Sequence, residues 1–191
     1  MTAVVFVQRA ISALESLQIP YVTVGSFAVN AYIEPRSTKD ADFVVEIDQL
    51  RIRELVAAIG PDFTFDPQMS FESVTRTPRY KIRHREALFT IELFGLTSDP
   101  HDQARFARRV RGAVGSTVAY VLSPEDIVVT KLRWCVRAPR AKDREDIENV
   151  LAVHCKTLDL RYIRQWTDQH GTRALFEQLL AEAERFNAGQ A

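Results

Sequence analysis

The hydrophobic pattern of this chain changes at Ser123, and that change limits the folds open to it. Before Ser123, short apolar segments typical of strands alternate with segments of helical period. Ser123-Pro-Glu-Asp126 is a strong helix start, with serine at the cap and proline in the first turn, and the pattern is helical from there to Asn187. Strands are expected at about 21–25, 41–47, 63–65, 71–75, 80–84, 88–94 and 118–122, and helices at about 3–18, 26–33, 49–60 and 100–111.

This order of elements predicts an α+β fold. A mixed β-sheet flanked by helices is expected over residues 1–122, and a C-terminal helical bundle packed on it over residues 123–191. Hydrophobic residues make up 46% of the chain, which is enough to bury a core.

Charge and cysteine content exclude several classes of protein. The 25 basic and 25 acidic residues balance, so the chain is not a uniformly basic nucleic-acid coat. Two cysteines, Cys135 and Cys155, cannot build a disulfide framework or a four-thiolate zinc site, and the four histidines show no metal-ligand spacing. With no signal peptide and no apolar run of the roughly 18 residues that a membrane span needs, we expect a soluble, cytoplasmic protein with no membrane partner.

Gly25-Ser26 stands between an expected strand and an expected helix. A glycine here lets the backbone approach a ligand closely, and free N–H groups at a helix start favour a phosphate. Ser26 is expected to cap that helix. A turn of this kind, taken alone, is usually only a turn.

Asp40 and Asp42 follow in the next expected strand. Side chains alternate along a strand, so both carboxylates lie on one face. Two like charges on one face repel each other unless a cation lies between them, and hard oxygen ligands in this arrangement suit Mg²⁺ or Mn²⁺. The alternative is a solvated strand end with two ordinary acids.

A third acid, Glu92, lies at the centre of the apolar strand Leu88–Phe94. A charge in a buried strand is expensive unless it is paired or bound to metal. Three carboxylates on adjacent strands would hold two divalent ions roughly 3.5–4 Å apart, the arrangement used for phosphoryl or nucleotidyl transfer. Alternatively, Glu92 lies on an edge strand in water or pairs with a nearby basic residue.

Together these motifs resemble the polymerase-beta-type nucleotidyltransferase superfamily. Residues 32–42, with the pattern Tyr-x-x-Pro-Arg-x-Thr-Lys-Asp-x-Asp, look like the minimal nucleotidyltransferases, including abortive-infection-type toxins of bacterial toxin–antitoxin systems. The later motifs, Ser123–Leu132 with Lys131 and Arg137–Ile147 with Lys142-Asp143-x-x-Asp146, look like the same group. The resemblance covers roughly residues 20–150.

The resemblance implies a role for each motif residue. It implies nucleotide binding by Gly25, Ser26, Lys39, Lys131 and Asp143. It implies metal binding by Asp40, Asp42 and Glu92, and catalysis by these three together with Lys131. The family usually has Asp where this chain has Glu92. The alternatives without a functional role are that Lys131 only extends from a helix edge to solvent, and that Asp143 and Asp146 pair with neighbouring basic residues.

A basic cluster lies just before Glu92, with no acid among its members Arg79, Lys81, Arg83 and Arg85. Strand alternation places Lys81, Arg83 and Arg85 on one face. The cluster could hold an RNA backbone near the metal site, although a solvated face is the usual explanation.

The sequence therefore predicts a Mg²⁺-dependent nucleotidyltransferase that moves an NMP from an NTP to an acceptor hydroxyl. By analogy with the toxin group, the acceptor would be a tRNA 3′ end or another RNA, and the partner a cognate antitoxin. The alternative is a non-catalytic nucleotide-binding or partner-binding module with the same fold. A restriction-type nuclease is disfavoured because Phe94 stands where its motif needs lysine.

Overall fold

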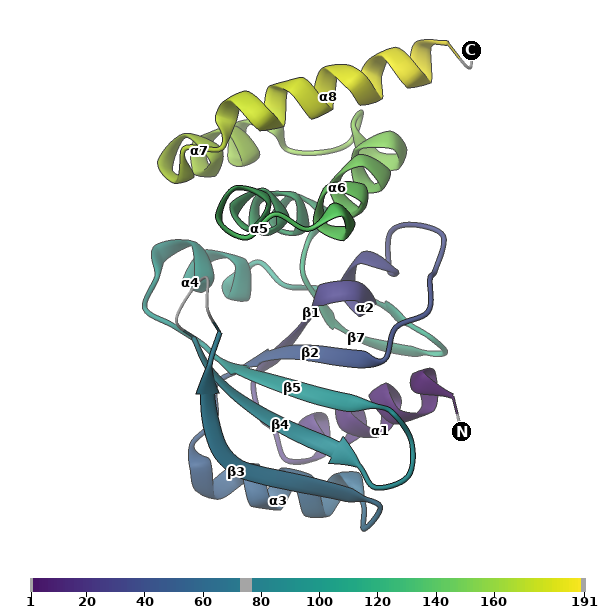
Figure 1. The fold of residues 1–191 in the computed structure, drawn as a ribbon, viewed down its shortest axis with the longest axis vertical. Coiled ribbons are helices and arrows are strands. Elements are labelled where there is room, and N and C mark those ends of the chain that lie inside the picture. Colours follow the sequence, from purple (N-terminus) through teal and green to yellow (C-terminus); the bar gives the residue numbers. More distant parts are fainter. Residues whose placement is uncertain (1, 73–76, 190–191) are drawn as a thin grey trace. The chain divides into compact units, whose positions relative to one another are not determined.

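The computed structural model describes residues 2–72 and 77–189, which form eight helices and one seven-stranded sheet (Figure 1). The chain divides into two compact units. The first, the sheet unit, contains Met1–Ala31 and Pro35–Leu122. The second, the helical unit, contains Ser123–Ala191 and the short segment Tyr32–Glu34.

The sheet runs in the order β3-β4-β5-β2-β1-β7-β6. The pairs β2–β5 and β1–β7 are parallel and the other neighbours are antiparallel, so the sheet is mixed, as the sequence predicts. The strands are β1 (Tyr21–Val24), β2 (Asp40–Val45), β3 (Phe63–Phe71), β4 (Pro78–His84), β5 (Thr90–Gly95), β6 (Val110–Val114) and β7 (Thr117–Val121).

The apolar face of the sheet is covered by two helices, α1 (Ala3–Ser16) and α3 (Gln49–Ile59), which lie on the same side of it (Figure 1). Phe43, Ile91 and Leu93, alternate residues of β2 and β5, are fully buried on this face. The ring of Phe6 in α1 lies 5.1 Å from that of Phe89, the residue just before β5. Burial of this face fixes the strand register, because a slip of one residue would turn the core side chains to the other face.

The opposite face of the central strands is more polar and carries the short helix α2 (Gly25–Val29), which packs on β1 and β2 (Figure 1). Alternation along β2 and β5 places Asp40, Asp42 and Glu92 here. Helix α4 (Pro100–Ala107) follows β5 in the chain.

The helical unit contains α5 (Pro124–Arg137), α6 (Ala141–His154), α7 (Leu160–His170) and α8 (Arg173–Ala188). Ser123 caps α5 as predicted, accepting a hydrogen bond from the Asp126 amide. Leu132, Ile147 and Phe176 form part of the fully buried core. No helix in the described ranges is long and apolar enough to cross a membrane.

Three local predictions differ from the structure. Helix α2 begins at Gly25 after Val24, so Ser26 is not its cap. The helix expected to reach Arg111 ends at Ala107, because the following residues pair with β7 in a hairpin whose turn has Gly115 at φ +61°. The strands expected at 63–65 and 71–75 overlap one strand, β3, that runs from Phe63 to Phe71; residues 73–75 lie outside the described residues.

Candidate active site

The backbone of Gly25 lies directly against the carboxylate of Asp42. Strands β1 and β2 pair Val24 with Asp42, so Gly25 follows at the end of the ladder. Gly25 has φ +61°, and a Cβ added to it would lie 2.0 Å from Asp42 Oδ2. Only glycine accepts both this backbone conformation and this approach. The close approach seen here is made by Asp42, itself a candidate site residue, and the approach of a nucleotide phosphate to Gly25 stays a prediction.

A row of charged residues crosses the sheet from Asp42. Asp42 is in register with Glu92 on β5, and Glu92 is in register with Lys81 on β4. The adjacent row places Asp40 beside Thr90. Asp40 is exposed, whereas Asp42 and Glu92 are half-buried. The structure thus brings the three predicted carboxylates to one face of two neighbouring strands.

Glu92 is held by two basic residues on β4. Lys81 Nζ lies 3.1 Å from Glu92 Oε1, and Arg79 Nη1 lies 3.4 Å from Oε2. The Glu92 side chain is 15% exposed. Pairing with a nearby basic residue is one of the interpretations that the sequence left open. The role of Glu92 as a metal ligand stays a prediction.

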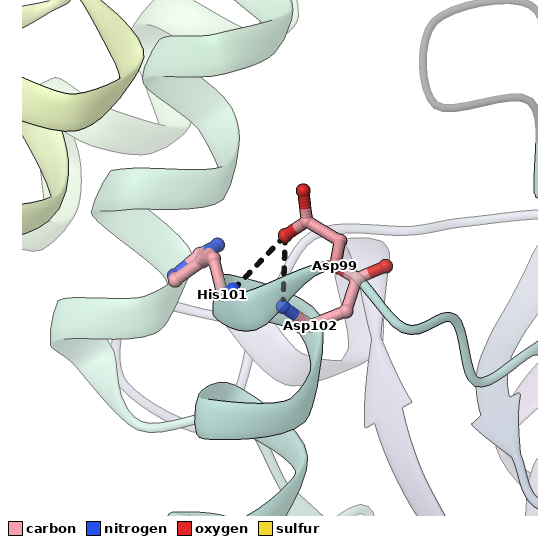
Figure 2. A group of neighbouring side chains, drawn as sticks. All are labelled: Asp99, His101 and Asp102. Atoms are coloured by element: carbon pink, nitrogen blue, oxygen red, sulfur yellow. Dashed lines mark hydrogen bonds between the residues drawn. The ribbon is translucent and has the colours of Figure 1, made fainter.

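A different group brings its ligand atoms closer together. Asp99, His101 and Asp102 have one ligand atom each within 4.8 Å of the others, so this group could hold a metal ion (Figure 2). In the described part of the chain, Asp40, Asp42 and Glu92 do not form such a group. The sequence did not predict this group because His101 has no ligand spacing to the other histidines, and its partners are instead the aspartates of Asp-x-His-Asp.

The structure also gives this group a role in capping α4. Asp99 Oδ1 accepts hydrogen bonds from the amides of His101, at 3.0 Å, and Asp102, at 3.1 Å (Figure 2). Asp102 Oδ1 accepts from Arg105 Nε at 2.9 Å, and Thr97 donates to Oδ2. Three of the four carboxylate oxygens are therefore already hydrogen-bonded within the unit.

Within the helical unit, Lys131 lies in a buried ion cluster. Its Nζ is 2.7 Å from Asp143 Oδ1 and 2.8 Å from Asp146 Oδ2, and both aspartate side chains are fully buried. Arg140 Nε lies 2.7 Å from Asp143 Oδ2. The cluster joins α5 to α6. Nucleotide binding by Lys131 and Asp143 is not tested by these contacts and stays a prediction.

Tyr32, the first residue of the motif over residues 32–42, belongs to the helical unit. His154 Nε2 lies 2.8 Å from the Tyr32 carbonyl oxygen, and the two rings are in edge contact. Burial, together with the charges of Glu125 and Asp126, raises the pKa of the Tyr32 hydroxyl well above its usual value.

The remaining predicted residues differ in their surroundings. Ser26 is buried, whereas Lys39 is exposed. Arg83 and Arg85 are exposed on the basic segment, and Arg85 Nε donates to the Pro61 carbonyl at 3.0 Å. Of the four residues proposed for RNA, Arg79 and Lys81 are thus engaged by Glu92, whereas Arg83 and Arg85 are exposed.

Comparison with known proteins identifies the fold. The chain resembles the solution structure of the antibiotic-resistance factor ANT(2'')-Ia, with 14% identity over 97% of each chain and a TM-score of 0.57. It also resembles the crystal structure of ANT(2'')-Ia in complex with adenylyl-2''-tobramycin, with 14% identity over 90% of this chain and 98% of that one and a TM-score of 0.60. The α+β chain therefore has the fold of nucleotidyltransferases. No protein-family profile matches the chain, and no curated protein sequence matches it significantly.

Proposed function

We propose that this protein is a nucleotidyltransferase that moves an NMP from an NTP to an acceptor hydroxyl and releases pyrophosphate. The observation that carries the proposal is the contact between Gly25 and Asp42 on a sheet of nucleotidyltransferase fold. This contact joins the glycine turn proposed for the triphosphate to a carboxylate proposed for the metal.

The donor set on β2 fits a divalent cation. Asp40 and Asp42 share a face, and neither carboxylate is fully buried, so both can reach a hydrated ion. Carboxylate oxygens are the ligands that Mg²⁺ and Mn²⁺ prefer. A bound ion of this kind would neutralise phosphate charge during transfer. The Gly25-Ser26 backbone would hold the triphosphate, with Lys39 as a further proposed nucleotide contact in the sheet unit. Nucleotide binding by Lys131 and Asp143 of the helical unit stays a separate prediction.

The acceptor is proposed to be the hydroxyl of an RNA, with a tRNA 3′ end as the first candidate. The exposed guanidinium group of Arg83 supports it, since it is available to phosphates; Arg85 is also exposed, although its Nε already donates to the Pro61 carbonyl. A toxin role with a cognate antitoxin partner in the cytoplasm belongs to the same proposal. The adenylylated tobramycin bound to ANT(2'')-Ia makes a small hydroxylated molecule the acceptor class to test beside RNA.

A second candidate function is a non-catalytic nucleotide-binding module of the same fold. The pairing of Glu92 with Lys81 and Arg79 favours it, because a carboxylate engaged by two cations is a weaker third ligand for a catalytic metal.

Label transfer from α-³²P-labelled NTPs with Mg²⁺ separates the two functions. The acceptors are bulk tRNA and a panel of hydroxylated small molecules, and the variants are Asp40→Asn/Asp42→Asn and the matched control Glu46→Gln, an exposed acid just after β2. Transfer should occur with the wild-type chain and Glu46→Gln and be lost in the double variant. NTP binding without transfer to any acceptor would instead establish the binding module, and equal transfer by the double variant would refute the site.

A further inference from the structure

Two observations disagree with a two-metal site built from Asp40, Asp42 and Glu92. Both oxygens of Glu92 are engaged, Oε1 by Lys81 and Oε2 by Arg79. In the described ranges the three carboxylates do not bring their oxygens within 4.8 Å of one another. A pair of divalent ions roughly 3.5–4 Å apart needs several carboxylate oxygens that converge on the ions. Glu92, with both oxygens already paired to cations, does not supply one.

The strand register explains why the ammonium of Lys81 lies beside Glu92. Parallel pairing of β2 and β5 places the like charges of Asp42 and Glu92 directly beside each other, which is unfavourable when neither is compensated. The antiparallel pairing of β5 and β4 places Lys81 on the other side of Glu92 in the same row. The Lys81 side chain is 31% exposed, so its ammonium interacts with Glu92 through a partly desolvated environment.

We propose that Lys81 takes the place of a second divalent cation in this site. It is a positioning residue: its ammonium orients and neutralises the Glu92 carboxylate beside Asp42, and the site binds a single divalent ion through Asp40 and Asp42. Arg79 supports Glu92 from the neighbouring row. This inference rests on the proposed nucleotidyl transfer and specifies its metal stoichiometry.

Manganese binding tests the inference without measuring turnover. The wild-type chain, in excess over a non-hydrolysable α,β-methylene NTP analogue, is titrated with Mn²⁺, and free Mn²⁺ is followed by electron paramagnetic resonance. The wild-type complex should bind about one Mn²⁺ per nucleotide, in contrast to the pair of a two-metal site. The double variant Arg79→Met/Lys81→Met should raise this to about two, because both oxygens of Glu92 then lose their cations. Lys81→Arg, which keeps the charge, should stay at about one.

Arg53→Met is the control, since Arg53 is an exposed cation on α3, which covers the opposite face of the sheet. It should leave the stoichiometry unchanged. Two ions in the wild-type complex would overturn the inference and leave the proposed function standing, as would an Arg79→Met/Lys81→Met complex that still binds one. A nucleotide analogue that binds Mn²⁺ no more tightly with the wild-type chain than without it would overturn the proposed function itself. If the double variant does not fold, the wild-type count and Arg79→Gln/Lys81→Gln decide between these outcomes.

Discussion

Replacement of Lys131 by methionine should strongly destabilise the helical unit. The change keeps the apolar stem of the side chain and removes the ammonium that lies 2.7 and 2.8 Å from two fully buried carboxylates. Removing one partner of a buried ion cluster costs about 3–5 kcal/mol, because the remaining charge stays in a poorly solvated place. Arg140 still pairs with Asp143, so we expect the lower end, about 3 kcal/mol.

Urea unfolding measures this loss. With a slope of about 2 kcal/mol per molar urea, the midpoint should fall by about 1.5 M. The double variant Lys131→Met/Asp146→Asn should recover part of the loss, because it removes one of the two buried charges. The control Lys156→Met, at an exposed lysine in the same unit, should change stability by less than about 0.5 kcal/mol.

A Lys131→Met midpoint equal to that of the Lys156→Met control would refute this reasoning. Nucleotide affinity, measured where the variant is still folded, separately tests the proposed contact of Lys131 with phosphate. A variant that is destabilised yet binds NTP as the wild type does would assign Lys131 to structure alone.

Two further predictions concern the sheet unit. Gly25→Ala should destabilise the protein by about 2 kcal/mol or more, since alanine is strained at positive φ and its Cβ would meet Asp42 Oδ2. In thermal melts Gly25→Ala/Asp42→Ala should recover only the steric part, and a Gly25→Ala chain as stable as the wild type would contradict the close approach. The hydrogen bond from Arg9 holds the pKa of Asp62 well below its usual value, so Asp62 stabilises the folded state above about pH 4 and that contribution is lost as pH falls below it. Urea midpoints measured from neutral pH downward should therefore fall less steeply in acid for Asp62→Asn, and an unchanged acid limb would argue against this pairing.

Local rules recovered much of this architecture from the sequence. The alternation of Asp40 and Asp42 along one strand depends only on the pleat of the backbone, so it could be stated without knowing which strands are neighbours. The cap at Ser123 is likewise a contact between residues three apart. The cap assigned to Ser26 was wrong because the helix begins one residue earlier, at Gly25, which leaves Val24 in the cap position.

Other features depend on pairings between distant segments. The strand β6 could not be found from its own residues, since Val110–Val114 is a largely exposed edge strand that carries little hydrophobic alternation and forms by pairing with β7. The ion cluster at Lys131 needs α6 packed against α5 before its aspartates can be identified as partners.

The sequence by itself determined which residues could carry chemistry: a glycine at a strand end, two carboxylates on one face, a third acid in an apolar strand and a basic segment before it. Only the tertiary structure decided which of them are neighbours. Glu92 could have faced water, a metal or a basic residue, and the register of β4 against β5 placed Lys81 beside it. That register is set by the burial of the opposite, apolar face, where Ile82 and Ile91 pair at the core. The hydrophobic contacts on the opposite face of the sheet therefore determine which residue pairs with Glu92. No sequence pattern near Glu92 contains that information.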